Sequence, residues 1–278
     1  MSLLPTSIRR GRTRSASLSP TAQSIFEDIV HQLPSISKFT ELTFENVDPD
    51  DGSLICRSLD SDAETERSCA RVNYNSVTRI LRLKLMPTAL HDVHQQWINK
   101  CLVEWRFNGL ITQQESKLLW GGVGTTFDQF SGIYSDSSKQ PDYYIRVTSI
   151  SSPRIIIETG WTESWPRLRQ DKNLWMLGDP SVLIVILIRW TAITRGRIKG
   201  SLEVWRRDTA GTLVSSTMSI FPAPSPLPPT ETIQFTKGEL FGTAMVAGAN
   251  PNTILEFDVA ELREFAEEVV TEMNMQPA

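Results

Sequence analysis

Two stretches of the chain are apolar at almost every position. The first, 154–158, reads Arg-Ile-Ile-Ile-Glu, and the second, 182–188, reads Val-Leu-Ile-Val-Ile-Leu-Ile. Runs of β-branched residues without polar alternation are typical of central strands that are covered on both faces. A shorter aromatic and β-branched run, 143–147, precedes them and predicts another strand. The middle of the chain therefore predicts three buried strands.

Helix signals separate and flank these strands. Between the two apolar runs, Ser164 can cap a helix, Pro166 fits its first turn, and Gly178 can end it. Capped and amphipathic patterns predict further helices at 19–33, 89–108 and 258–274. Shorter patterns predict more strands at 41–44, 79–85, 127–134, 198–206 and 212–221.

This order of elements predicts an α/β protein with a mixed central sheet flanked by helices, and with helical additions at the N-terminal and C-terminal ends. A chain of 278 residues can bury roughly three quarters of its unfolded surface. We therefore expect a single α/β domain over 19–278, behind a disordered basic leader at 1–18. The segment 48–66 is rich in Asp, Ser and Glu and is interpreted as a long exposed loop.

Composition excludes several classes of protein. No apolar run approaches the roughly 20 residues of a membrane-spanning helix, and residues 1–19 lack the apolar centre of a signal peptide. The three cysteines, Cys56, Cys69 and Cys101, show no zinc-binding spacing. They suit a reducing compartment, so we expect an intracellular protein, cytoplasmic or nuclear, without a membrane partner.

Two acids stand where the predicted strands meet. Asp142 opens the strand 143–147, and Glu158 ends the strand 154–158. If the two strands form a hairpin, the two carboxylates lie close together, and at about 4 Å they repel by roughly 4 kcal/mol at an effective dielectric near 20. Such a pair needs a cation or a shared proton. Carboxylates are ligands that Mg²⁺ prefers, so Asp142 and Glu158 predict a metal site.

The arrangement resembles the PD-(D/E)xK, or restriction-endonuclease-like, nuclease superfamily, whose core is a helix, a three-stranded meander, a helix and a strand. Residues from about 88 to 206 fit that core. The runs 138–142, 157–164 and 168–171 are similar to a group of uncharacterised fungal proteins within this fold. The resemblance implies phosphodiester hydrolysis with Mg²⁺ or Mn²⁺, a DNA or RNA partner, and in many members a homodimer.

The third letter of (D/E)xK falls on Gly160, so the lysine that would orient the attacking water is missing there. Some members of the superfamily supply it from the following helix, where Lys172 shares a face with Leu168 and Trp175. Lys172 is accordingly a candidate catalytic residue, or a lysine that pairs with a neighbouring surface acid while its stem covers Trp175. Glu104 is a candidate third acid, or an exposed helix residue.

Two other patterns are interpreted as structural. His91 and His94 lie three residues apart on the predicted helix 89–108, but no third His or Cys is near in sequence, so we interpret them as surface histidines. The glycines of 121–126 lack the spacing and the lysine of a phosphate-binding loop, and they predict a flexible lead into a strand.

Charge is unevenly distributed. The chain has a net charge of -4, which argues against a wholly basic nucleic-acid-binding surface. Residues 166–207, however, hold nine Lys and Arg against three Asp and Glu, an excess of six. This excess either forms a basic rim for a phosphodiester substrate or is a set of solvated charges at strand edges.

Two hypotheses follow. The first is a metal-dependent nuclease in which Asp142 and Glu158 hold the metal and Lys172 orients the attacking water. The alternative is a catalytically inactive restriction-endonuclease-like scaffold that binds protein or nucleic acid. Gly160 at the lysine position favours the alternative, and saturable Mn²⁺ binding would favour the first.

Overall fold

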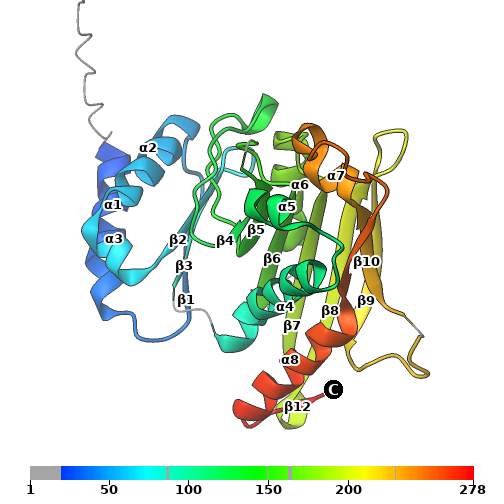
Figure 1. Cartoon of the computed structure of the whole chain (residues 1–278). Helices are drawn as coiled ribbons and strands as arrows, with labels where there is room; N and C mark the ends of the chain where they lie inside the picture. Colours follow the sequence, from blue (N-terminus) through cyan, green and yellow to red (C-terminus); the bar gives the residue numbers. More distant parts are fainter. Residues whose placement is uncertain (1–19, 86–87, 149, 162–164, 229) are drawn as a thin grey trace, which may run out of the picture.

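A computed structural model describes residues 20–85, 88–148, 150–161, 165–228 and 230–278. The chain forms an N-terminal unit beside a larger α/β core (Figure 1). The helices and strands, in chain order, are α1 (Pro20–Gln32), β1 (Thr40–Phe44), α2 (Pro49–Asp60), α3 (Ala63–Ser68), β2 (Arg71–Asn75), β3 (Ile80–Leu85), α4 (Ala89–Phe107), α5 (Gln113–Leu118), β4 (Leu119–Gly122), β5 (Tyr143–Val147), β6 (Ile155–Trp161), α6 (Trp165–Gly178), β7 (Ile184–Ile193), β8 (Arg197–Arg207), β9 (Leu213–Phe221), β10 (Thr232–Thr236), α7 (Lys237–Phe241), β11 (Ile254–Asp258), α8 (Val259–Glu272) and β12 (Gln276–Pro277).

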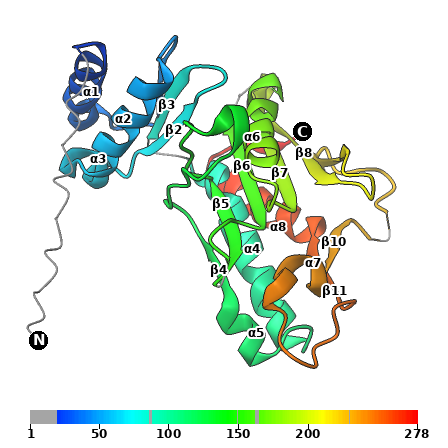
Figure 2. The ribbon, with the colours of Figure 1, turned by 90° about the horizontal axis from the view of Figure 1, so that it is seen from above.

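The N-terminal unit is a three-stranded antiparallel sheet covered by helices on one face. Its strand order is β1, β3, β2, and α1, α2 and α3 lie on the side away from the core (Figures 1 and 2). Alternate residues of β2 and β3, such as Val72 and Leu83, are buried against these helices. The intervening residues point to the opposite face. Arg71 and Lys84, which are paired across the two strands, therefore point toward the core.

The core is built on a mixed sheet with the strand order β12, β8, β7, β6, β5, β4, and β9 also pairs with β8. Strands β4, β5 and β6 form an antiparallel meander, and β6 is parallel to β7. Helices α4 and α8 cover one face and α6 covers the other (Figure 2). The prediction of a mixed α/β fold is confirmed.

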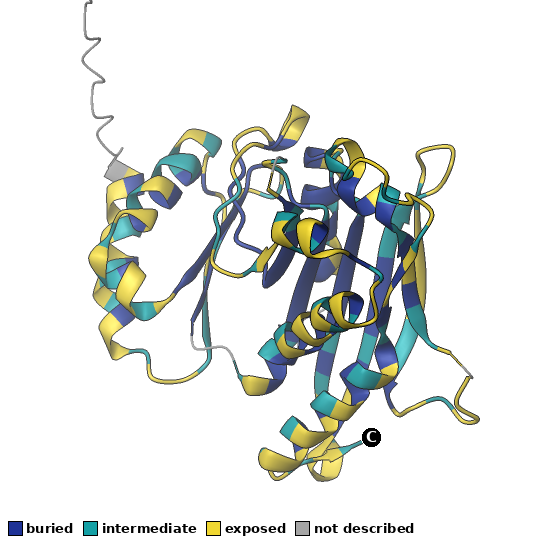
Figure 3. Cartoon of the chain, in the orientation of Figure 1, coloured by how far each residue is buried: buried dark blue, intermediate teal, exposed yellow. Residues whose placement is uncertain are grey.

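Burial on both faces explains the two apolar runs. Ile155 and Ile157 of β6 pack into the cluster that contains α4 and α8, whereas Ile156 packs with Trp175 of α6. The central strands are buried along most of their length (Figure 3). The strands predicted at 143–147, 154–158 and 182–188 are confirmed as β5, β6 and β7, and the helix between them is α6. The predicted cap Ser164 lies outside the described residues.

Two predictions of secondary structure are wrong. The segment 48–66 is not a loop, because α2 and most of α3 lie within it, and Ile55 and Leu59 of α2 are fully buried. The many acidic residues of this segment hid the helical pattern, in which the apolar residues Ile55 and Leu59 lie four positions apart. No strand forms at 127–134, where Phe127 makes only an isolated bridge to Lys139. The meander uses β4 instead.

Several other expectations have mixed outcomes. The N-terminal addition contains the sheet β1–β3 as well as helices, and the β10–β11 hairpin was not predicted. The leader 1–18 lies outside the described residues. The single domain over 19–278 stays a prediction, although the two units have separate hydrophobic clusters. In the part of the chain that the structure describes, no helix has both the length and the apolar character needed to cross a membrane.

Candidate functional site

The segment that leads into Asp142 is held by β2 of the N-terminal unit. The main chains of Tyr74 and Ser138 exchange two hydrogen bonds, of 2.7 and 3.0 Å. The main-chain N–H of Gln140 donates to Oδ1 of Asn73 at 2.9 Å. Because the segment is pinned along its length, Asp142 enters β5 in a fixed position.

The register of the sheet places the two predicted metal ligands opposite each other. Tyr143 of β5 pairs with Ile157 of β6, so the next positions outward are Asp142 and Glu158. Both side chains are buried, with exposed fractions of 1% and 0%. The structure therefore brings the two carboxylates together, although their role as metal ligands stays a prediction.

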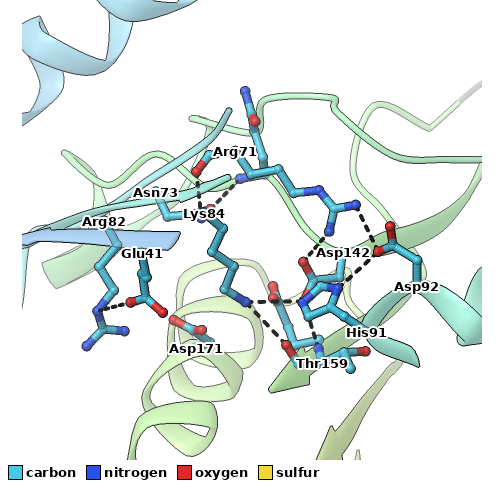
Figure 4. A network of polar contacts seen from close by, with 12 residues as sticks. Glu41, Arg71, Asn73, Arg82, Lys84, His91, Asp92, Asp142, Thr159 and Asp171 are labelled. Carbon is cyan, nitrogen blue, oxygen red and sulfur yellow. Dashed lines mark hydrogen bonds and ion pairs between the residues drawn. The ribbon is translucent and has the colours of Figure 1, made fainter. Parts of the chain in front are cut away.

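Asp142 is surrounded by donors (Figure 4). Its Oδ1 accepts from Nη1 of Arg71 at 2.5 Å, and its Oδ2 accepts from Nζ of Lys84 at 3.3 Å and from the main-chain N–H of Thr159 at 2.7 Å. Burial alone would raise the pKa of Asp142, but the charge of Lys84, followed by those of His91 and Arg71, outweighs burial and holds the pKa well below its usual range. Asp142 is thus an ionised carboxylate at neutral pH.

Glu158 is in a less cationic environment. Its Oε1 accepts a hydrogen bond from Nε1 of Trp175 at 2.7 Å, and Nζ of Lys139 lies 3.4 Å from its Oε2. Burial raises the pKa of Glu158 to about 8, with Lys139 lowering it and the charge of Asp142 raising it further. Among the described residues, no hydrogen-bond donor is assigned to the buried Oε2. Within the described residues, Oε2 of Glu158 therefore has the ion pair with Lys139 but no assigned hydrogen bond.

Lys139 links Glu158 to a third acid. Its Nζ lies 3.0 Å from Oδ2 of Asp171 on α6, and its side chain is buried. Burial lowers the pKa of Lys139, but the charges of Asp171 and Glu158 raise it by more. The buried amine is therefore protonated. The sequence holds Lys139 three residues before Asp142, yet sequence reasoning assigned no role to Lys139 or Asp171.

Lys172 lies in a different environment. Its Nζ is 3.9 Å from the centroid of the Trp205 ring and donates to Oδ1 of Asn173. Within the described residues it forms no ion pair with Asp142 or Glu158. The catalytic role of Lys172 stays a prediction, and Lys139 is the lysine that contacts Glu158.

The acid that α4 contributes near this site is Asp92 rather than Glu104. Oδ1 of Asp92 lies 3.3 Å from Nη2 of Arg71, which also binds Asp142. Glu104 instead pairs with Lys100 at 3.6 Å, and the Glu104 side chain is 42% exposed. The residues of α4 that face the carboxylates therefore lie in its first turns.

The interpretation of His91 and His94 as surface residues is wrong. Both are buried, and Nε2 of His91 lies 3.6 Å from Oδ2 of Asp142. Nε2 of His94 lies 3.3 Å from the main-chain oxygen of Asp142, and Thr159 contacts its Nδ1. Burial lowers the pKa of His94 to about 4, so its ring is neutral at physiological pH. The signal was available, because Leu90 and Val93 place this helix face in the core.

The space around the carboxylates is small. Between Lys84, Lys139 and Asp171 the free volume is about 10 Å³, which is close to the room that one water molecule needs. A groove of about 720 Å³ lies next to this network, and its walls include Arg71 and Asp92. Glu158 is fully buried and does not line this groove.

The oxygen atoms at this site partly match the ligands that a hard divalent cation requires. Mg²⁺ commonly takes one or two protein carboxylates and completes its shell with waters and phosphate oxygens. Asp142, the Oε2 atom of Glu158 and the carbonyl oxygen of Thr159 supply suitable atoms. Lys84 already donates to Asp142 and to that carbonyl oxygen at 3.3 Å, so a metal would displace its amine. No group of three His, Cys, Asp or Glu side chains in the described ranges could hold a metal ion.

Comparison with known proteins adds no family to this picture. The chain matches no protein-family model, no curated protein and no solved structure.

Proposed function

We propose that this protein is a metal-dependent nuclease with a restriction-endonuclease-like core and a site built on Asp142 and Glu158. The observation that carries the proposal is a buried network in which Lys139 pairs with Glu158 and Asp171, while Asp142, whose charge acts on Glu158, pairs with Arg71 and Lys84. Removing so many charges from water opposes folding, since the penalty for each ion is several kcal/mol. Groups buried at such a cost are frequently functional.

The order of the core elements supports the proposal. Helix α4, the β4–β5–β6 meander, helix α6 and strand β7 occur in this order, with the short helix α5 between α4 and β4, and this is the order that the PD-(D/E)xK resemblance implies apart from α5. Asp142 and Glu158 lie on neighbouring strands of the meander, as that resemblance requires of the two acids.

Each residue of the cluster has a task in this proposal. Asp142 and Glu158 would hold the cation, and a bound divalent cation would lower the pKa of a water molecule and neutralise charge on the phosphate. Burial raises the pKa of Glu158 to about 8, and cation binding would lower this pKa and favour the ionised carboxylate.

Lys139 would take the role of the lysine that the (D/E)xK pattern has at position 160, where this chain has Gly160. Its ammonium is held by Glu158 and Asp171, so it is positioned to donate to a phosphate oxygen or to an attacking water. Lys172 is a second candidate for this task, and the two lysines can be separated by mutation.

A second candidate function is a scaffold of the same fold that binds a partner without catalysis. The ion pairs of Asp142 with Arg71 and Lys84 favour the scaffold, because these two cations already neutralise the carboxylate. In the scaffold the N-terminal unit stays on the site permanently. In the nuclease it moves when the metal and substrate bind.

Cleavage of labelled single- and double-stranded DNA and RNA in Mn²⁺ tests the proposal. We expect cleavage by the wild type, and a loss of about 100-fold or more in Glu158→Gln, a variant that keeps an oxygen for the hydrogen bond from Trp175. Lys139→Met should lose activity if this lysine is catalytic, whereas the exposed Lys117→Met is the control. Absence of cleavage by the wild type, or equal cleavage by Glu158→Gln, would favour the scaffold.

A further inference from the structure

The sheet has a polar face that follows from its register. In β7 and β8 the even-numbered residues, such as Ile188, Ile198 and Leu202, point into the core beside α4 and α8. The odd-numbered residues therefore point to the side of α6. Beyond α6 they form a surface that we name the β7–β9 face, whose main members are Arg189, Arg197, Lys199, Ser201, Thr217 and Ser219.

This face becomes more accessible with distance from α6. Leu187 of β7 is fully buried under the helix, whereas Arg189 and Ser201 are half-buried. Lys199 of β8 and Thr217 of β9 are exposed. The outer part of the sheet thus presents hydroxyl and cationic side chains to solvent.

Its charge contrasts with that of the whole chain. Three of its members, Arg189, Arg197 and Lys199, are cations, whereas the whole chain has a net charge of -4. Two acids lie in β8 and in the turn that follows it. Glu203 is neutralised by Arg169, which donates to both of its oxygens at 3.1 and 2.5 Å. Asp208 lies in the β8–β9 turn, where its Oδ1 accepts from two main-chain N–H groups.

Two tryptophans position cations along the α6 border of this face. The guanidinium carbons of Arg169 and Arg189 lie 5.7 and 5.9 Å from the centroid of the Trp165 ring. Nζ of Lys172 lies 3.9 Å from the centroid of Trp205. Cation–π contacts restrict these long side chains, so less conformational entropy is lost when they bind an anion.

The face is continuous with the carboxylate site. Gly160 of β6 pairs with Arg189, which pairs with Ser201, which in turn pairs with Ser219. Neighbouring strands are about 4.8 Å apart, so Arg189 lies one strand from Gly160, the position at which the site lacks its lysine. A strand of substrate that crosses β9, β8 and β7 along this line would arrive at Gly160, two residues from Glu158.

We propose that the β7–β9 face binds the phosphate backbone of single-stranded nucleic acid and leads it to the carboxylate site. Clustered cations in a chain of negative net charge select a polyanion. A sheet face with half-buried aromatic side chains suits an unpaired strand, whose bases can stack. The inference rests on the proposed function in naming nucleic acid as the partner, but binding by this face does not require cleavage.

Fluorescence anisotropy with a labelled oligothymidylate of about 20 nucleotides, in EDTA so that metal-dependent cleavage cannot occur, tests the inference. The test variant is Arg197→Glu with Lys199→Glu. The matched control is Arg106→Glu with Lys117→Glu, which changes the net charge equally at two exposed residues of α4 and α5. Thermal unfolding should be nearly unchanged in both, since all four side chains are exposed.

We expect the test variant to bind at least about tenfold more weakly than the wild type and the control. The slope of log K against log salt concentration should fall by at least about 1.4, about 0.7 for each lost phosphate contact. Equal weakening in both variants, tighter binding of a duplex than of the single strand, or no binding by the wild type would overturn the inference. Neutral Arg197→Gln with Lys199→Gln should give a smaller loss, and no loss would also overturn it.

Cleavage in Mn²⁺ is scored separately from this binding. If the wild type binds through the β7–β9 face but does not cleave, the nuclease proposal fails and the inference about the surface stands. If it cleaves while the test variant binds normally, the inference fails and the nuclease proposal stands.

Discussion

Asp142→Asn removes one negative charge from a buried network and keeps the shape of the side chain. In the wild type, the carboxylate of Asp142 accepts hydrogen bonds from Arg71 of β2, Lys84 of β3 and the main-chain N–H of Thr159. The first two belong to the N-terminal unit. The substitution therefore tests whether this carboxylate joins the two units.

The expected loss of stability depends on the contacts that Arg71 and Lys84 keep in the variant. Without the charge of Asp142, Arg71 keeps Asp92 at 3.3 Å, and Lys84 keeps the carbonyl oxygen of Thr159 and the charge of Asp171. Removing one partner of a buried ion pair typically costs about 3–5 kcal/mol. Because Asp92 remains, we expect a loss near the lower end, about 3 kcal/mol in the free energy of unfolding.

Urea denaturation followed by tryptophan fluorescence gives this free energy. Exposed Asp128→Asn is the control and should change it by no more than about 0.5 kcal/mol. The pKa of Asp142 is lowered in the folded state, so its stabilisation is present above the ordinary pKa of an aspartate and is lost as the pH falls through the lowered value. The difference between wild type and Asp142→Asn should therefore shrink in acid.

A loss below about 1 kcal/mol at pH 7 would refute this reasoning, because removing a buried carboxylate that pairs with two cations should cost more than that. A double-mutant cycle with Lys84→Met sharpens the test. The double variant should be less destabilised than the sum of the single variants, by about 0.5–3 kcal/mol. Simple additivity would mean that Lys84 and Asp142 do not interact.

Three further predictions concern single sites. Burial raises the pKa of Glu158 to about 8. Between pH 6 and 9 the free energy of unfolding, measured by urea denaturation, should therefore fall more for the wild type than for Glu158→Gln. Parallel pH profiles of the two proteins would contradict this. Gly200→Ala would place a methyl group 2.4 Å from the ring of Trp190 and should lower the free energy of unfolding by about 1–3 kcal/mol, while no loss would show that the sheet can adjust. Only the exposed Cys69 should react with a thiol reagent before unfolding, because burial raises the pKa values of the other two thiols to about 12; faster reaction of a second thiol would contradict the structure.

The sequence predicted the core strands because their burial leaves a local signal. Unbroken runs of Ile, Leu and Val occur in β6 and β7, which are covered on both faces. Helix α2 was missed for the opposite reason. Its exposed side is rich in Asp and Ser, and only Ile55, Cys56 and Leu59 carry the buried stripe.

The site was predicted in part. Asp142 and Glu158 could be paired because adjacent strands bring them together over a short loop. Arg71 and Lys84 could not, since they are 71 and 58 residues from Asp142 in sequence and reach it only through the docking of a separate sheet. Lys139 lies only three residues before Asp142, but its contacts with Glu158 and Asp171 depend on how α6 packs on β6.

The most direct test of the central claim, that Asp142 and Glu158 hold a divalent cation, is the thermal unfolding of the wild type and of Glu158→Gln in increasing Mn²⁺. The account predicts a saturable stabilisation of the wild type, about 2.7 kcal/mol when Mn²⁺ reaches 100 times its Kd, and little or none for Glu158→Gln. No stabilisation of the wild type, or the same stabilisation of both proteins, would contradict it.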